Sequence, residues 1–557
     1  EQEEQQSCKM KWSLVSVLLL ISILKNTLGE RFFISAPSVF HVGAKEKVLV
    51  QMGGEYLNKV VTVYLEDQGA LMSEKKKTQC STENDINIVE LMIDRNRWSE
   101  SKRRSSKKPY LDLVAEVFGD RKRKITKVLV SDHRGYIFIQ TDQPMYNPTQ
   151  TVKYRIFTLD HMFRPYQGTI ITSVFNAAGN RIMKSLKNSE KGIFSGHFPI
   201  PSVSESGTFK ITAHYDDDEA KVAVREFKVQ KFVLPSFEVS IGAERRYILL
   251  NDQQFDFTIS AMYSYGERVN GAYHCEFGFM TIGQKSPHII SGLELTGSVI
   301  DGRATATLQL KNIDWKQLNQ TLSDLQNSGS QLFVGVFVTN IQNGEVQEEK
   351  LYLPIFPHKY KIDLSRTRSY FIPGYPVEVV AVVRYPDGTP AVGVPVNISI
   401  ASQQDSRITN EYGGVYSAFN FNATSSFRVD VSSDGLQESK NIEPASSPTG
   451  SYLYISFTHK VYNVGESLFL TFRTPTAPTN GGYIYYMVLS RGMIITKGSL
   501  VHGTLTTGSV SITADMVPFF RLIGYYHGNN GDIIADSVWV DVRDECEIKV
   551  TVSTQNR

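Results

Sequence analysis

The 557-residue sequence lacks the short patterns that mark the common kinds of active site. Its four cysteines include no Cys-x-x-Cys pair, and its eleven histidines include no His-x-His or His-Glu-x-x-His motif. No metal site is therefore expected. A Gly-x-Ser-x-Gly turn and a glycine-rich phosphate loop are also absent, although serine hydrolases and nucleotide-binding proteins usually carry them. His133 could be imagined as a base, but it fits a linker better. We predict a non-enzyme with no catalytic, cofactor-binding or metal-binding residue.

A strong net charge is missing too, because 59 basic residues against 57 acidic ones leave only +2. The chain has no overall attraction to nucleic acid or an acidic membrane. The basic stretches Ser101–Lys108 and Arg121–Lys124 could bind a polyanion such as heparin, but they carry no interleaved aromatic residues and are more typical of solvated loops. The acidic run Asp216–Glu219 is interpreted as a hairpin tip rather than a calcium site.

The only long apolar run lies near the N-terminus, where "WSLVSVLLLISIL" follows Met10. It is too short to span a bilayer of about 30 Å as a helix, and Thr27 and Gly29 have the spacing that a signal peptidase prefers. We expect a signal peptide at 10–29, preceded by a non-native acidic leader at 1–9, and therefore a secreted protein. The alternative is a core helix at 14–24, but nothing amphipathic surrounds it.

Helical patterns are scarce in the rest of the chain. Trp315–Asn327 alone places apolar residues at helical spacing. Elsewhere, short runs such as "KVLVQM", "TFKITAHY", "FDFTISAMY" and "GYIYYMVLS" are rich in β-branched and aromatic residues and are bounded by turn residues, a pattern typical of strands. The sequence therefore predicts an all-β protein with one short helix.

One strand-turn-strand arrangement recurs through the chain. It is clearest in "DQPMYNPTQTVKYRIF", and similar stretches lie near Gly43, Asn251, Gly374 and Gly465. The spacing of roughly 90 to 125 residues is the size of one β-sandwich domain. We predict a tandem array of antiparallel, immunoglobulin-like β-sandwiches.

These stretches resemble the thioester-containing complement and alpha-macroglobulin proteins, from about Ser35 to Arg557. The resemblance is carried by "GYIFIQTDQPMYNPTQTVKYRIFTLDHMFRP", "FKVQKFVLPSFEVSI", "KIDLSRTRSYFIPGYPVEVVAVVRYPDGTPAVGVPV" and "YYMVLSRGMII". Within the family, these stretches of sequence are most similar to the fourth complement component. The resemblance implies macroglobulin-like domains at 30–133, 134–230, 231–356, 357–448 and 449–543, and the start of a sixth at 544–557.

The chemistry of this family depends on a Gly-Cys-Gly-Glu-Gln stretch that forms an internal thioester, and this sequence contains none. The resemblance therefore implies a scaffold that supports convertase assembly in the classical or lectin pathway. Its partners would be the remaining processed chains of the same precursor, complement proteases and convertase components. The alternatives are the N-terminal part of an alpha-macroglobulin protease inhibitor and a free-standing adhesive sandwich protein.

The sequence also indicates candidate sites for disulfide formation and glycosylation. Without Cys8 in the leader, an odd number of cysteines remains: Cys80 in a polar loop, Cys275 in a strand, and Cys546. Cys275 is expected to be a buried thiol. The resemblance implies that Cys546 forms an interchain disulfide. The Asn-x-Ser/Thr sequons make Asn319, Asn397 and Asn422 the glycosylation candidates.

Overall fold

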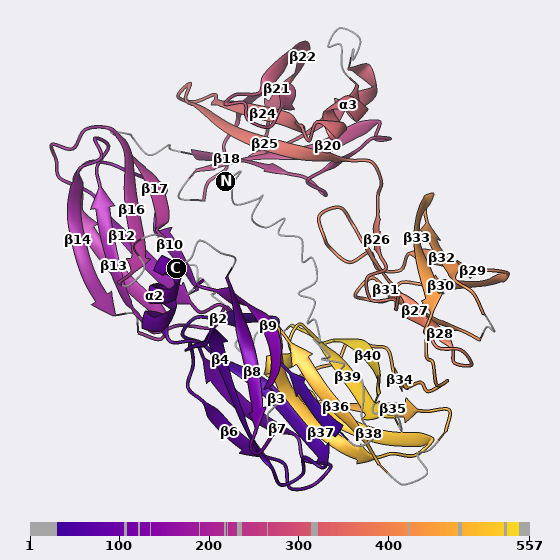
Figure 1. Ribbon diagram of the computed structural model, residues 1–557. Coiled ribbons are helices and arrows are strands. Elements are labelled where there is room, and N and C mark those ends of the chain that lie inside the picture. The colour runs from indigo at the N-terminus through magenta and orange to yellow at the C-terminus, as the bar shows by residue number, and fades with distance from the viewer. Residues whose placement is uncertain are drawn as a thin grey trace. The chain divides into compact units, whose positions relative to one another are not determined.

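The computed structural model describes residues 30–544 except 105–108, 121–122, 134, 189, 217–218, 220, 231–236, 264–265, 314–320, 421–423, 477–481 and 529–531. The chain divides into two compact units, Glu1–Phe232 with Ser447–Arg557 and Val233–Ser446. Nearly all of the regular structure is β-strand, in paired antiparallel sheets (Figure 1). The prediction of an all-β array of sandwiches is confirmed. The predicted signal peptide and leader lie outside the described residues.

The first sandwich packs sheet β1-β3-β7 against sheet β2-β9-β8-β4-β5, with β6 paired to β4. Its apolar core includes Val48, Val63 and Leu113. Its strands are β1 (Glu30–Ser35), β2 (Val39–His41), β3 (Lys45–Gly54), β4 (Val60–Asp67), β5 (Ala70–Leu71), β6 (Lys76–Gln79), β7 (Asn87–Met92), β8 (Tyr110–Val117) and β9 (Arg123–Ser131).

A helix in this sandwich corrects the prediction of a single helical segment. Helix α2 (Arg95–Arg104) follows β7 and includes the first part of the basic stretch that we interpreted as a loop. The Asp94 carboxylate accepts a hydrogen bond from the Arg97 backbone N–H at 2.9 Å, which satisfies a donor that the first turn of a helix leaves free. Trp98 is buried in the core. One apolar anchor among charged residues makes too weak a periodic signal to be recognised.

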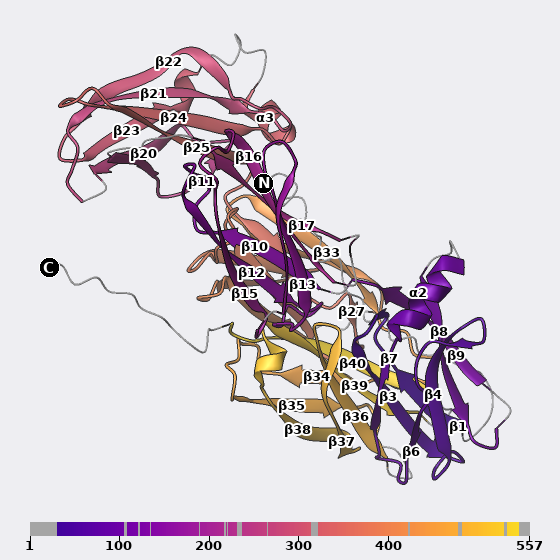
Figure 2. The same cartoon turned by 90° about the vertical axis from the view of Figure 1, so that its left-hand side faces the viewer.

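The second sandwich belongs to the same unit and packs sheet β10-β12-β15 against sheet β11-β17-β16-β13-β14. Figure 2 shows its two layers from a second direction. Its strands are β10 (Tyr136–Thr141), β11 (Met145–Tyr146), β12 (Thr151–Leu159), β13 (Thr169–Phe175), β14 (Arg181–Asn188), β15 (Ile193–Pro199), β16 (Gly207–Tyr215) and β17 (Ala223–Val229).

The recurring turn moves the chain from one sheet to the other. In the second sandwich the chain leaves β10, forms the two-residue β11 parallel to β17 in the opposite sheet, and returns in β12. The Tyr146 hydroxyl donates to the Asp142 carboxylate at 2.5 Å, and the Lys153 backbone N–H donates to the same oxygen at 3.0 Å. The other sandwiches repeat the short parallel pairing, in β2 with β9, β19 with β25, β27 with β33, and the bridge from Tyr462 to Val542. The most distinctive stretch of the sequence is therefore structural.

The second unit contains the third and fourth sandwiches, each with a three-stranded and a five-stranded sheet. Helix α3 (Leu322–Asn327) confirms the end of the predicted helix, and residues 315–320 lie outside the described part. The third sandwich contains β18 (Phe237–Gly242), β19 (Ile248–Leu249), β20 (Gln254–Tyr263), β21 (Gly271–Met280), β22 (His288–Val299), β23 (Arg303–Gln309), β24 (Gln331–Asn340) and β25 (Val346–Phe356). The fourth contains β26 (Lys361–Asp363), β27 (Tyr370–Phe371), β28 (Val377–Arg384), β29 (Pro395–Ile400), β30 (Gln403–Ile408), β31 (Gly414–Phe419), β32 (Phe427–Ser433) and β33 (Leu436–Pro444).

The fifth sandwich returns to the first unit and packs sheet β34-β35-β38 against sheet β37-β36-β39-β40. Its strands are β34 (Tyr454–Phe457), β35 (Ser467–Arg473), β36 (Tyr483–Ser490), β37 (Met493–Val501), β38 (Leu505–Ser511), β39 (Phe519–His527) and β40 (Ile533–Asp541). In Figures 1 and 2 it lies directly beside the first sandwich. Within the described residues, no helix has the length and apolar character needed to cross a membrane.

Candidate functional site

Most of the residues singled out from the sequence do not converge on one site. Asn319, Asn422 and Cys546 lie outside the described residues. Asn397 is exposed on β29, where its side-chain oxygen accepts a hydrogen bond from the Ser406 hydroxyl at 2.7 Å. Its glycosylation stays a prediction.

The two described internal cysteines are free and buried. Cys80 lies in the loop between β6 and β7, as expected, and its side chain is buried in the core of the first sandwich. Cys275 lies in β21, and burial raises the pKa of its thiol to about 12. Neither thiol is activated for nucleophilic chemistry, because such chemistry needs a thiolate near neutral pH.

The described basic residues of Arg121–Lys124 are used within the first sandwich. The Arg123 guanidinium pairs with Glu66 at 2.7 Å and with Glu116 at 3.0 Å. The Lys124 ammonium lies 4.4 Å from the centre of the Phe32 ring. These contacts partly neutralise the local positive charge, which weakens the case for a polyanion site here.

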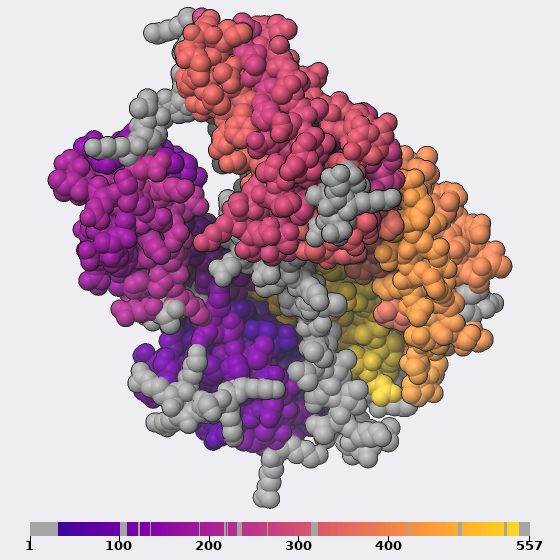
Figure 3. Space-filling view, turned by 90° about the horizontal axis from the view of Figure 1, so that it is seen from above, coloured from indigo at the N-terminus to yellow at the C-terminus, as the bar shows by residue number. Residues whose placement is uncertain are grey.

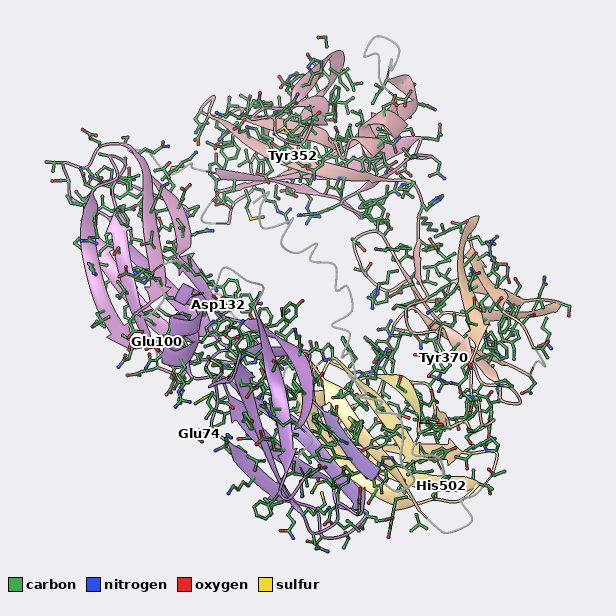
Figure 4. The ribbon with its side chains drawn as sticks, viewed as in Figure 1. Glu74, Glu100, Asp132, Tyr352, Tyr370 and His502 are labelled. Atoms are coloured by element: carbon green, nitrogen blue, oxygen red, sulfur yellow. The ribbon has the colours of Figure 1, made fainter. Side chains whose placement is uncertain are left out.

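His133 lies in the segment between the first and second sandwiches, as the linker interpretation expects. Its ring packs 4.7 Å from that of Tyr136. The adjacent Asp132 carboxylate pairs with the Lys221 ammonium at 3.0 Å, which ties this segment to the second sandwich. Figure 4 labels Asp132 at this junction. Both residues therefore serve the connection between domains.

An apolar contact within the first unit joins the first sandwich to the fifth. An apolar cluster forms between them from Phe33, Leu49, Ile86, Tyr485, Met487, Leu489, Ile494, Ile523 and Tyr525. It is separate from the cores of the two sandwiches. Its members lie in β1, β3, β36, β37 and β39 and at Ile86 just before β7, and most residues of β3, β36 and β39 are buried. Burial of this kind makes an interface resemble a domain core.

Hydrogen bonds fix the register of this contact. The Tyr525 hydroxyl donates to the Gln51 side-chain oxygen at 2.8 Å, and the Tyr485 hydroxyl donates to the Glu83 carbonyl at 2.6 Å. The Lys497 ammonium donates to the Ile86 carbonyl. Burial raises the pKa of Tyr525 well above its usual value. A buried polar group without a partner is costly, so these pairs favour one arrangement of the two sandwiches.

The sequence carries a signal for this contact. The runs "VLVQM" in β3 and "YIYYMVLS" in β36 are almost continuously apolar rather than alternating. Such runs are typical of strands that are buried on both faces. The signal indicates a covered strand but does not indicate what covers it.

A smaller contact joins the first and second sandwiches, which touch in Figure 3. His41 ends β2, Glu46 lies in β3, and His161 lies in the turn after β12. The His41 and His161 rings stack with their centres 4.0 Å apart, and His41 Nδ1 lies 2.9 Å from Glu46 Oε1. Burial and then the nearby His41 lower the pKa of His161 below its usual value, which favours the neutral imidazole. Sequence motifs could not find this group, because only the contact between sandwiches brings His161 to the other two.

A polar contact also links the second sandwich to the fifth. The Arg164 guanidinium pairs with the Asp515 carboxylate at 2.8 Å. Both side chains are well exposed, so this pair contributes little to stability by itself. The first and fifth sandwiches are held together by the apolar cluster and its hydrogen bonds.

Five domain families match the chain in consecutive order. They are macroglobulin domain MG1 at residues 29–131, the MG2 domain at 136–229, macroglobulin domain MG3 at 231–317, macroglobulin domain MG4 at 362–444, and the alpha-2-macroglobulin bait region domain at 453–557. These matches confirm the resemblance at the level of the complement and alpha-macroglobulin proteins.

Two curated relatives match along most of the chain. Complement C3 of Oncorhynchus mykiss is 28% identical over 93% of this chain and 33% of its own length, and a venom factor of Crotalus adamanteus is 28% identical over 95% of this chain and 32% of its own length. The chain thus spans about a third of these relatives. These two relatives do not support the fourth component as the nearest member.

A solved structure of trypsin-activated alpha-2-macroglobulin from Escherichia coli covers 92% of this chain and 37% of its own length. Its sequence identity is 14% and its TM-score is 0.39. This TM-score is too low to establish a shared arrangement of the domains.

Proposed function

Because the chain belongs to the complement and alpha-2-macroglobulin family, we propose that it is a secreted scaffold that supports assembly of a complement convertase. The domains described here are non-catalytic, so the work is protein–protein association. The observation that carries the proposal is the ordered run of five family domains, together with the similarity of the chain to complement C3 and a venom factor.

The proposed role depends on a surface that keeps its shape. The buried Tyr525–Gln51 hydrogen bond and the apolar cluster around Met487 hold the first and fifth sandwiches together. Residues on these two domains can then face a partner with little loss of conformational freedom, which lowers the cost of binding. The partners that we propose are the remaining processed chains of the same precursor and the serine proteases of the convertase.

The finer question is in which complement pathway the chain acts. The sequence resemblance favoured a protein like the fourth component, which acts with the second component in the classical and lectin pathways. The C3 and venom factor relatives favour a C3-like protein instead. We propose the C3-like role first and retain the fourth-component role as the finer alternative to be tested.

A competition experiment tests the proposal in both pathways. The purified chain is added in increasing amounts to serum from the organism that encodes it, and lysis of target cells is measured. If the chain carries a convertase docking surface, it competes with the intact protein and lowers lysis. Inhibition confined to antibody-dependent lysis would favour the fourth-component role, and inhibition of antibody-independent lysis would favour the C3-like role. Heat-denatured chain is the control, and no inhibition in either assay would contradict the proposal.

A protease inhibitor is the second candidate function. The match of residues 453–557 to the alpha-2-macroglobulin bait region domain is the observation that favours it. The two functions differ in the domains encoded further along the transcript: an anaphylatoxin domain behind a basic cleavage site would support complement, and an unstructured bait segment would support the inhibitor. Sequencing the complete transcript separates them.

A further inference from the structure

Three potential metal ligands meet where the first and second sandwiches touch. His41 and Glu46 flank the turn between β2 and β3, and His161 comes from the second sandwich. One donor atom from each residue lies within 4.8 Å of the other two. Two imidazoles and one carboxylate are a donor set that zinc uses in proteins. We propose that His41, Glu46 and His161 bind one zinc ion that bridges the first and second sandwiches.

The spacing of the three donors is close to what zinc requires. Donors at about 2.1 Å from a tetrahedral zinc ion lie about 3.4 Å from one another. The distance between any two of the three donor atoms therefore shortens by no more than about 1.4 Å on binding, the difference between 4.8 Å and 3.4 Å. His41 and His161 are half-buried, so an ion can enter from the solvent side and a water can complete the coordination.

The rings must reorient when the ion binds. Their planes are 19° from parallel at a centre separation of 4.0 Å, so they face each other. An imidazole lone pair lies in the plane of its ring, and the His161 ring must therefore turn its edge toward the ion. His161 lies in the turn after β12 rather than inside a strand.

The charge at this site favours a cation. Glu46 is buried, and its carboxylate accepts from the backbone N–H of His41 at 3.3 Å and contacts His41 Nδ1 at 2.9 Å. A buried carboxylate is costly unless it is paired, and a bound cation offsets that cost.

The nearby charged residues already have other contacts. The Asp160 carboxylate accepts from the backbone N–H groups of Met162 at 2.8 Å and Arg164 at 2.9 Å, and this bonding shapes the turn that carries His161. The Arg164 guanidinium is paired with Asp515. The zinc ligands are therefore the three residues named, with Asp160 as the residue that positions His161.

Zinc titration of the full chain, produced without a histidine tag, tests this proposal. Calorimetry should give one zinc per chain, and saturating zinc should raise the midpoint of thermal unfolding, because an ion that binds the folded state alone stabilises it. The His161→Gln variant should bind zinc at least about tenfold more weakly. His197→Gln is the matched control, because His197 is an exposed histidine on β15 of the same sandwich. Equal binding by both variants, or no binding by the wild-type chain, would overturn the proposal.

X-ray absorption of the zinc-loaded wild-type chain gives an answer that does not depend on any variant. The expected zinc environment contains two imidazoles and oxygen donors only. Sulfur in the coordination shell, or fewer than two imidazoles, would place the ion elsewhere and refute the assignment.

Discussion

The Tyr525 hydroxyl donates a hydrogen bond to the side-chain oxygen of Gln51 at 2.8 Å, across 474 positions of sequence. Both residues are almost completely buried between the first and fifth sandwiches. A polar pair in this setting specifies one alignment of the two domains, since any other alignment leaves two buried groups without partners. Together with the apolar cluster around it, this pair joins two domains that are distant in sequence but belong to one compact unit.

Removal of the hydroxyl should therefore weaken this contact. We expect Tyr525→Phe to lower the free energy of unfolding of the first unit by about 1 to 3 kcal/mol, because Gln51 loses its buried partner. Denaturant unfolding, followed by the tryptophan fluorescence of the chain, measures the change. Tyr352→Phe is the control, since Tyr352 is partly exposed on β25 in the other unit. Equal effects of the two substitutions would contradict the importance of this hydrogen bond.

The same hydroxyl predicts a dependence on alkaline pH. Burial raises the pKa of Tyr525 well above its usual value of about 10. A pKa that is raised in the folded state gives stability that is complete below the unfolded pKa and is lost as pH rises toward the folded pKa. The free energy of unfolding should therefore fall above about pH 10, and less steeply in Tyr525→Phe. Unfolding titrations at several alkaline pH values test this, and identical pH profiles for the two proteins would count against it.

The buried thiol of Cys275 should resist modification. With its pKa raised to about 12 by burial, only about one molecule in ten thousand carries the thiolate at pH 8. We expect no labelling of Cys275 by iodoacetamide in the native chain and complete labelling after denaturation. Peptide mass mapping gives the result, and rapid native labelling would show that β21 opens readily.

Cys546 provides the contrasting prediction, which rests on the family resemblance. If its disulfide partner belongs to another processed chain, the thiol should be reactive in this chain alone. We expect rapid alkylation at Cys546, or a disulfide-linked dimer on a non-reducing gel that Cys546→Ser abolishes. A native bridge from Cys80 to Cys546, or an unlabelled and monomeric Cys546, would rule out this role.

Local patterns predicted the strands, the repeat and the end of helix α3, because these features depend on residues close together in sequence. The turn at Asp142 was recognised, but its pairing of β11 parallel to β17 was not, since that pairing depends on a strand about 80 residues away. Helix α2 was missed because Trp98 is its one buried side chain among those described. The group of His41, Glu46 and His161 depends on two domains meeting, and no motif records such a contact.

The account depends most on the claim that the first and fifth sandwiches form one body. Limited proteolysis is expected from the sequence to cut near residues 133, 231, 357 and 449. After cuts near 231 and 449, size-exclusion chromatography of the undenatured digest measures whether the fragment that ends near 230 stays with the fragment that begins near 450. We predict that these two fragments elute together, and that Met487→Lys, which places a charge in the apolar cluster, separates them. Separate elution of the wild-type fragments would contradict the account.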